Sequence, residues 1–467
     1  MNPEVSVKMD VRKKFRTVAR RIHPSDALFH RRDIFLGLLG VLIGVFIGLV
    51  AEALKLLISF VTNISYYGVF SFDEASPSKN HLGFWALFIP AIGGLAVGLM
   101  ARFVNKGVYG HGLPETMEKI LLNDSLIEKR MLFLKPIAAA ISVGTGGPFG
   151  DEGPIIATGG TLGSAVGQIL KTTNYERKIL LSCGVAGAVA AAFGSPFGGI
   201  FLALELMLFE FKARSLVPVV LCAITAELIR MKFIGDALAF PIPQVDLPSG
   251  TVDLLCYFSI GLIAGLVAVG ITHCVHFLES TFDKLPVHWM WWPAIGGLCV
   301  GGFGLLDARI LGAGYETIDE LLSGKILGLA AVSLFAFKLC AWVIGVSSRT
   351  TAGTLAPLFF IGSSLGVFLC GILMHYFPAV LLDYKIAALV GMGALFTGVT
   401  RSFLASVFIV LECTHQFWAS VPVLAGAVAA YLISLFLMHH SIITHELVKK
   451  GVRVPSEVHD AQDEKKP

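Results

Sequence analysis

Long apolar runs constrain this chain more than any other feature of its sequence. Residues 33–60 and 252–278 are two examples, and each contains few charged residues. A helix of about 20 apolar residues crosses the hydrocarbon core of a bilayer. Similar runs recur along the 467 residues, of which only 15% are charged, where about a quarter is usual for soluble domains. The sequence therefore predicts an all-α polytopic membrane protein in the lipid bilayer.

Basic residues at the two ends of the chain predict its topology. Residues 8–32 hold nine Lys or Arg and no apolar core, so they do not resemble a signal peptide. Such a cluster before the first span predicts a cytoplasmic N-terminus. Lys449, Lys450 and Arg453 follow the last span and predict the same side for the C-terminus. We expect topology and lipid contact from these charges, no nucleic-acid binding, and residence in the cell (inner) membrane.

Motifs of enzymes and metal sites are missing from the sequence. The eight cysteines stand singly in apolar surroundings without Cys-x-x-Cys, and the 13 histidines form no His-Glu-x-x-His. No Gly-x-Ser-x-Gly stands at a predicted helix start. We therefore expect no enzyme activity, no bound metal and no cofactor.

The chain contains an internal repeat. The sequence "PAIGGLAVG" at 90–98 returns as "PAIGGLCVG" at 293–301, with eight of nine residues identical at an offset of 203. At the same offset, "GDEGPIIATGGTLG" returns as "GTLAPLFFIGSSLG", and a looser match at offset 207 pairs Glu205 with Glu412. Self-similarity over such a period indicates two copies of one structural unit.

The repeat predicts how the chain is organised. We expect a cytoplasmic basic segment at 1–32, a first membrane repeat at 33–230, a Pro- and Gly-rich linker at 231–251, a second repeat at 252–445 and a short cytoplasmic tail at 446–467. Repeats in transporters are commonly inverted and place the substrate site near the bilayer midplane. The repeat itself leaves the relative orientation of the halves open.

Three segments predict helices that begin inside the membrane. Gly150-x-x-x-Pro154 and Gly353-x-x-x-Pro357 are repeat-related, and "GHGLPE" at 110–115 has the same frame. Proline suits the first turn of a helix, and a helix N-terminus carries unpaired N–H groups and positive partial charge, which attract anions. The alternative is that these glycines serve only close helix packing.

Two lysines favour the anion-binding interpretation. Lys135 and Lys338 each lie 15 residues before the glycine of a repeat-related motif, within apolar runs. A lysine inside the membrane is costly and usually functional. Three helix starts of one kind and two lysines suggest a shared, positively charged centre that attracts anions. Asp151 and Glu152 are the negative groups at this centre, and one of these carboxylates is expected to mimic the anion when the anion is absent.

Taken together, these motifs resemble those of the CLC family of chloride channels and chloride/proton antiporters. "GHGLP" is similar to the family's G-S-G-I-P, "GDEGP" to G-R-E-G-P and "GTLAP" to G-x-F-x-P. They appear in the family's order, and the resemblance covers about 35–450. It implies two inverted-repeat halves of tilted and broken helices, and a homodimer with one pore per subunit.

The resemblance also implies roles for individual residues. The protein would be a voltage-gated chloride channel, with Glu152 as its gate and chloride as its substrate ion. The anion-binding residues would be Gly110, His111, Gly112, Gly150, Gly153, Gly353, Thr354 and Leu355, with electrostatic support from Lys135 and Lys338.

The chain departs from the family pattern at four positions. His111 stands where the family often has serine, and Asp151 replaces arginine, which would make the outer mouth less positive. Leu206 occupies the position of the antiporters' inner proton-relay glutamate, and Ile443 that of the central tyrosine.

These departures favour passive chloride permeation as the function. The alternative is chloride/proton antiport in which Glu205 or Glu210 substitutes for the missing relay. A third reading, an unrelated transporter of amino acids or metal cations, fits the intramembrane lysines poorly.

Overall fold

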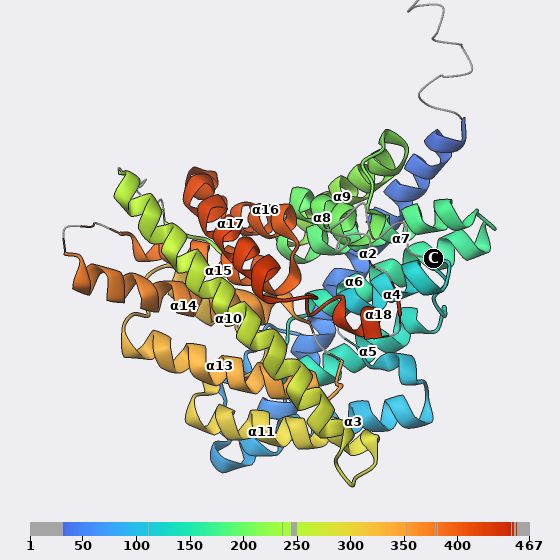
Figure 1. Ribbon diagram of the computed structural model, residues 1–467. Coiled ribbons are helices and arrows are strands. Elements are labelled where there is room, and N and C mark those ends of the chain that lie inside the picture. The colour runs from blue at the N-terminus through green and yellow to red at the C-terminus, as the bar shows by residue number, and fades with distance from the viewer. Residues whose placement is uncertain are drawn as a thin grey trace, which may run out of the picture.

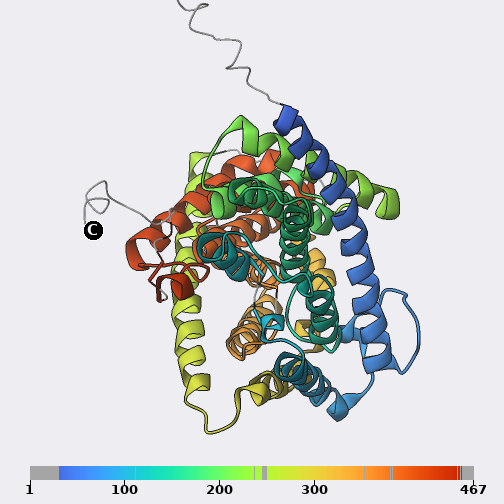
Figure 2. The ribbon, with the colours of Figure 1, turned by 90° about the vertical axis from the view of Figure 1, so that its right-hand side faces the viewer.

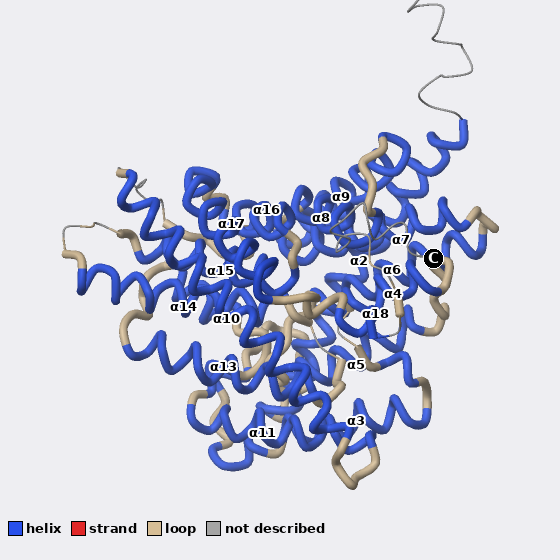
Figure 3. Tube along the Cα trace, in the orientation of Figure 1, coloured by secondary structure: helices blue, strands red, loops and turns tan. Residues whose placement is uncertain are grey.

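A computed structural model describes residues 31–454, apart from 111, 236, 244–249, 352, 379, 381, 450 and 453. The described part of the chain is helical and contains no strand, only one isolated bridge (Figures 1 and 3). Among the described residues, seven helices are long and apolar enough to cross a membrane. The predicted all-α polytopic fold is confirmed. His111, Lys450 and Arg453, which the sequence singled out, lie outside the described residues.

Eight helices of the first half correspond in order to eight of the second. The first half contains α2 (Arg31–Thr62), α3 (Ile89–Phe103), α4 (Leu113–Leu122), α5 (Met131–Gly144), α6 (Glu152–Ile169), α7 (Asn174–Phe193), α8 (Pro196–Ala203) and α9 (Ala213–Ile234). The second contains α10 (Thr251–Asp283), α11 (Trp292–Leu306), α12 (Tyr315–Leu322), α13 (Leu329–Ser347), α14 (Leu355–Tyr376), α15 (Tyr384–Thr400), α16 (Phe403–Thr414) and α17 (Ser420–Leu437). The short helix α18 (His445–Lys449) follows.

Short helical segments connect or extend these helices. Two are π-helical turns, η2 (Asn63–Tyr67) after α2 and η6 (Leu204–Leu208) after α8. The others are 3₁₀ turns, namely η3 (Pro77–Lys79), η4 (Gly83–Leu87), η5 (Lys106–Val108), η7 (Trp289–Trp291), η8 (Ala308–Ile310) and η9 (Phe417–Ala419). Because α9 runs to Ile234, the predicted linker at 231–251 begins inside a helix; the predicted domain boundaries otherwise stay predictions.

The two halves pack alike inside. In the first half α6 packs on α7 and α2 on α9, and in the second half α14 packs on α15 and α10 on α17. Figure 2 shows α2 and α10 running along opposite sides of the molecule. Contacts between the halves join equivalent helices, α3 with α11 and α8 with α16.

The α3–α11 contact gives the relative orientation that the sequence left open. A Cβ atom on Gly94 would overlap the carbonyl oxygen of Pro293, and one on Gly297 would overlap that of Pro90. The contact therefore advances along one helix as it retreats along the other, so the two equivalent helices are antiparallel. Antiparallel copies of a membrane helix mean that the repeats are inverted, as the resemblance implied.

Several helices are too short to span a membrane. The helices α4 and α12 have ten and eight residues, and α8 and α16 have eight and twelve, against the roughly 20 that a bilayer core requires. Helices of this length cannot cross a bilayer by themselves, and Figure 3 shows loop segments meeting near the centre of the protein. Backbone groups at such ends need partners because no water is available inside a bilayer.

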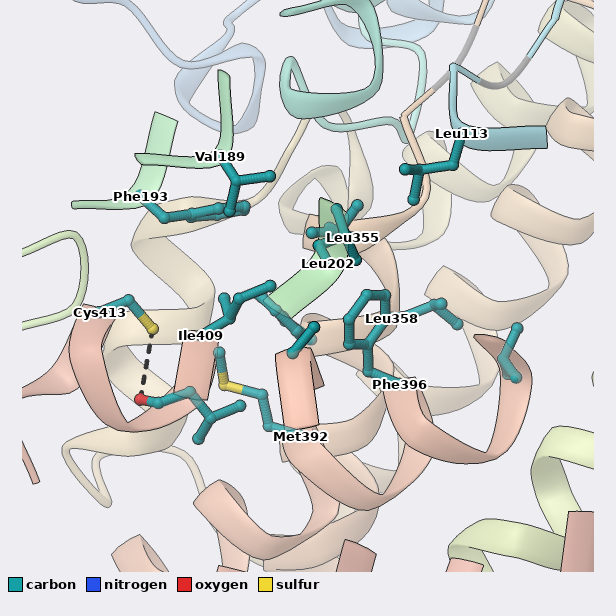
Figure 4. Packing of buried hydrophobic residues seen from close by; sticks show 14 of the residues in the cluster. Leu113, Val189, Phe193, Leu202, Leu355, Leu358, Met392, Phe396, Ile409 and Cys413 are labelled. Atoms are coloured by element: carbon teal, nitrogen blue, oxygen red, sulfur yellow. Dashed lines mark hydrogen bonds between the residues drawn. The ribbon is translucent and has the colours of Figure 1, made fainter. Parts of the chain in front are cut away.

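The apolar core is shared by the two halves. Figure 4 shows Leu113 of α4, Leu202 of α8 and Leu355 of α14 among its buried side chains, with Phe396 of α15 and Ile409 of α16. This continuous packing surrounds the start of α14 and fixes it relative to the first repeat.

Candidate functional site

The predicted helix starts converge at the centre of the protein. A Cβ atom on Gly112, just before α4, would overlap the backbone of Gly153 in α6. One on Gly353, just before α14, would overlap the carbonyl oxygen of Gly150. The three motifs therefore approach one another so closely that only glycine fits at these contacts.

The loop before α4 is fixed to the loop before α14. Gly110 forms an isolated parallel bridge with Thr351. The φ angles of Gly110 and Gly112 are 121° and 84°, in the region that glycine adopts without strain. These two glycines therefore set the backbone that leads into α4.

Glu152 lies on the N-terminus of the helix from the other repeat. It is the first residue of α6 and its side chain is completely buried. Its Oε1 atom accepts a hydrogen bond of 3.1 Å from the backbone N–H of Ala356, the second residue of α14. Its Oε2 atom has no hydrogen-bond partner among the described residues. The carboxylate thus occupies the kind of helix end at which anions bind.

Asp151 and Tyr315 complete the surroundings of this carboxylate. The Tyr315 hydroxyl lies 3.0 Å from Glu152 Oε1 and also contacts Asp151 Oδ1. Asp151 is only 4% exposed. The sequence placed Asp151 at the outer mouth; its carboxylate is buried against Tyr315, and its role there stays a prediction.

The two repeat-related lysines hold equivalent loops. Lys135 is buried, and its Nζ atom donates to the carbonyl oxygen of Tyr109 at 2.8 Å, just before the Gly110 motif. It also forms an ion pair of 2.5 Å with Glu115. Because this partner neutralises its charge, Lys135 gives the centre less positive potential than the sequence suggested.

Lys338 makes a different set of contacts. Its Nζ atom donates to the carbonyl oxygens of Ile310 and Gly312 at 2.9 and 2.7 Å, and lies 5.0 Å from the centre of the Phe360 ring. It has no carboxylate within ion-pair distance in the described part of the chain. Lys338 is completely buried, so its charge remains available to an anion nearby.

Glu205 and Glu412 make equivalent contacts, each with the start of a helix in the other half. Glu205 accepts from the Ser402 hydroxyl at 2.6 Å and from the backbone N–H groups of Leu404 and Ala405, at the start of α16. Glu412 accepts in the same way from groups of Ser195, Phe197 and Gly198 at the start of α8. These six partners form three pairs related by the offset of 207, so each repeat caps a helix of the other.

The sequence linked Leu206, Glu210 and Ile443 to proton transfer, and their surroundings differ from those of Glu152. Leu206 is 3% exposed within η6. Glu210 follows η6 in a loop and binds the Tyr175 hydroxyl at 2.6 Å, the Ser215 hydroxyl at 2.8 Å and Lys212 at 2.7 Å. Ile443 is buried just before α18, which packs on α4. Their roles stay predictions.

Two functional candidates were missed by the sequence reading. Ala356 carries the N–H that Glu152 binds, and Tyr315 carries the hydroxyl. A signal for Tyr315 existed, because "GAGYE" at 312–316 repeats "GHGLP" at 110–114 with an offset of 202. Tyr315 is thus the repeat equivalent of Leu113, placed at the same helix start.

A comparison with protein families identifies this arrangement. A family model described as "Voltage gated chloride channel" matches residues 93–435, well over half of the chain. The chain belongs to the CLC family. The predicted family is confirmed, and with it a role in anion transport; the CLC family consists of transporters and channels, not enzymes.

Curated CLC relatives are similar over most of their length. A putative chloride channel protein, ClcB-like, from Ralstonia nicotianae is 26% identical over 357 residues, which cover 75% of this chain and 83% of the relative. The voltage-gated ClC-type chloride channel ClcB of Escherichia coli K12 is 28% identical over 359 residues, covering 76% and 85%.

Solved CLC structures share the fold. The X-ray crystal structure of a slow cyanobacterial Cl⁻/H⁺ antiporter aligns with a TM-score of 0.80 at 19% identity, covering 90% of this chain and 98% of that one. A CLC-type fluoride/proton antiporter aligns with a TM-score of 0.70 at 23% identity, covering 86% and 95%.

Proposed function

We propose that this CLC protein moves chloride across the membrane in exchange for protons, with Glu152 as both gate and proton carrier. The observation that supports this most is the carboxylate of Glu152 on the N-terminus of α14, hydrogen-bonded to Ala356. An ionised carboxylate and a chloride ion compete for such a positive end. Protonation removes the charge of the carboxylate and weakens its hold.

Chloride would take the position that the carboxylate leaves. The first four N–H groups of a helix have no partner within the helix, and those of Leu355 and Ala356 open α14. Thr354 precedes them, and Gly353 and Gly150 keep side chains out of the space beside Glu152. The unpaired charge of Lys338 would stabilise the bound anion. Gly110, Gly112 and Gly153 would shape the path beside it.

Proton exchange fits the Glu152 site better than passive flow does. A buried carboxylate with one unpartnered oxygen and a hydroxyl beside it is suited to gaining and losing a proton. The two similar solved structures named above are described as proton antiporters. The inner proton carrier would be Glu205 or Glu210, the two titratable groups closest in sequence to Leu206.

Passive permeation is the second candidate, and Leu206 favours it. Leucine cannot carry a proton, and Ile443 lacks the hydroxyl of a tyrosine. The curated relatives named above are described as channels. Under this reading, Glu152 still gates the anion but no sustained proton movement accompanies chloride.

One experiment separates the two candidates. Purified protein in liposomes is given a chloride gradient with the membrane potential clamped, while chloride efflux and proton uptake are recorded together. Exchange predicts uphill proton movement that disappears in Glu152→Gln. Chloride efflux without proton movement would support passive permeation, and potassium passage in place of chloride would contradict both.

We also propose a homodimer in the cell membrane with both termini cytoplasmic. The exposed apolar side chains of the helices serve lipid or subunit contact, and native mass spectrometry from detergent separates monomer from dimer. Accessibility of single cysteines placed before Arg31 and after Val454 to an impermeant reagent, in inside-out and right-side-out vesicles, tests the topology.

A further inference from the structure

We propose that Asp151 and Tyr315 form a proton relay that loads and unloads Glu152; this inference rests on the proton exchange proposed above. The Tyr315 hydroxyl contacts both carboxylates, Asp151 Oδ1 and Glu152 Oε1. Asp151 and Glu152 are adjacent in the chain, so the hydroxyl joins two neighbouring carboxylates.

The hydrogen bonds of Tyr315 leave a place for one more proton in the cluster. A tyrosine hydroxyl has one proton to donate, although its oxygen can also accept. Two ionised carboxylates cannot both be satisfied by one donor, and like charges at this spacing oppose each other. The second contact is therefore completed when one carboxyl is protonated and donates to the Tyr315 oxygen.

The charged groups around the cluster do not supply that second donor. Lys338 of α13 faces the loop before Tyr315, and its Nζ atom donates to backbone carbonyls such as those of Ile310 and Gly312. Glu316, the next residue of α12, points to an exposed ion pair with Lys79 at 2.8 Å. A proton on one of the two carboxyls would supply that second donor.

This geometry permits transfer in one concerted step. The proton of Asp151 passes to the Tyr315 oxygen, so an Oδ–H bond breaks and an Oη–H bond forms. The original Tyr315 proton passes to Glu152, so that Oη–H bond breaks and an Oε–H bond forms. Tyrosine is regenerated, Asp151 is left ionised, and Glu152 becomes neutral and free to leave α14.

The cluster reaches toward the surface through Tyr315, its most exposed member. Glu152 has no exposed surface, Asp151 is 4% exposed, and Tyr315 is partly exposed. Tyr315 is held in place because Gly314 adopts a left-handed conformation with φ of 81° and Lys338 binds the preceding loop. The exposed surface of Tyr315, and the small one of Asp151, are thus where the cluster can exchange protons with water that does not reach Glu152.

The test uses two variants that remove a single proton carrier and little volume. Tyr315→Phe removes only the hydroxyl, and Asp151→Asn keeps an oxygen that can accept from Tyr315 but holds no transferable proton. The matched control is Tyr66→Phe, because the Tyr66 hydroxyl is buried and, among the described residues, bonds the carbonyl oxygen of Thr145 at 3.0 Å and no carboxylate.

Proteoliposomes with a chloride gradient give the readout. We expect Tyr315→Phe and Asp151→Asn each to lower proton uptake about tenfold, the change expected from losing one buried hydrogen bond in the transfer path, while Tyr66→Phe keeps the wild-type proton-to-chloride ratio. In a Glu152→Gln background neither change should alter chloride flux further, because the relay has nothing left to load.

The relay and the proposed chloride/proton exchange would be contradicted by different results. If the wild type exchanges both ions and folded Tyr315→Phe or Asp151→Asn keeps the wild-type ratio, the relay is wrong. Faster chloride flux with an unchanged proton-to-chloride ratio would show that Tyr315 is only a structural contact, and this result would also contradict the relay. If the wild type moves chloride and no protons, the proposed exchange itself fails.

Discussion

Glu412 and Glu152 each place a carboxylate on the N-terminus of a helix from the other repeat, yet they are held very differently. Glu412 uses both oxygens, with one hydroxyl and two backbone N–H groups as donors at the start of α8. Glu152 has one backbone donor and the shared hydroxyl of Tyr315, and its Oε2 atom has none among the described residues.

This difference separates a structural carboxylate from a removable one. Hydrogen bonds to a charged group contribute about 1.5–3 kcal/mol each, so the loss of three such bonds opposes any movement of Glu412. Glu152 loses less on leaving α14, and the cost falls further once it is protonated. The same helix-end chemistry therefore serves assembly at α8 and, in our proposal, gating at α14.

The largest effect is expected for Glu152→Gln. Glutamine carries no charge and no transferable proton, so proton uptake should fall by about a hundredfold or more, the lower range of general acid–base contributions. Acid outside should raise chloride flux in the wild type, because protonation neutralises the plug, and should leave the variant unaffected. Wild-type proton uptake and pH dependence in this variant would refute the gate.

A large effect on stability is expected for Glu412→Ala. This change leaves Ser195 and two backbone N–H groups at the start of α8 without their acceptor, at a cost of about 2–4 kcal/mol in the free energy of unfolding. Thermal unfolding in detergent measures it, with Glu152→Ala as the matched control. The comparison fails if Glu152→Ala destabilises the protein as much as Glu412→Ala does.

A smaller effect on anion affinity separates the two lysines. Lys338→Met removes an unpaired buried charge, and we expect about a tenfold loss in chloride affinity, as for a charge acting over several ångströms at an effective dielectric constant near 20. Lys135→Met should change the affinity less, because Glu115 already neutralises Lys135. Chloride titration calorimetry of both variants tests this order.

A double variant sharpens the lysine comparison. If Lys338 only neutralised Glu412, adding Glu412→Gln to Lys338→Met would restore affinity. Glu412 binds groups of Ser195, Phe197 and Gly198 instead, so we expect no recovery. Recovery would show that the two charges interact in the functional state.

Much of the fold and the outline of the site could be predicted from sequence. Apolar runs gave the membrane class, and the repeat of "PAIGGLAVG" identified the two helices, α3 and α11, that meet across the halves. The convergence of the Gly-x-x-x-Pro motifs at one centre was also expected, because helix starts inside a membrane carry unpaired N–H groups that one anion at a shared centre can bind.

The partners of the charged residues could not be predicted. The pairing of Lys135 with Glu115, but of Lys338 with carbonyl oxygens, depends on loop paths rather than on spacing. The burial of Asp151 depends on Tyr315, which lies 164 residues away. Such contacts follow from the tertiary arrangement of inverted halves, whose orientation the repeat alone left open.

The smallest effect is expected for Glu210→Gln. Burial raises the pKa of the Glu210 carboxyl, but hydrogen bonds from Lys212, Tyr175 and Ser215 together outweigh burial and lower that pKa below its ordinary value. A carboxyl with a lowered pKa stays ionised at neutral pH, and the stability it contributes is lost only as pH falls through that pKa.

Such a group is poorly suited to pass a proton at neutral pH. Proton uptake driven by a chloride gradient should therefore remain close to wild type in Glu210→Gln, with a stability loss of about 1 kcal/mol or less because the Lys212 side chain is 66% exposed. Glu205→Gln is the matched comparison, since Glu205 lies next to Leu206. If proton uptake vanished in Glu210→Gln and not in Glu205→Gln, Glu210 would be the inner proton carrier despite its ion pair.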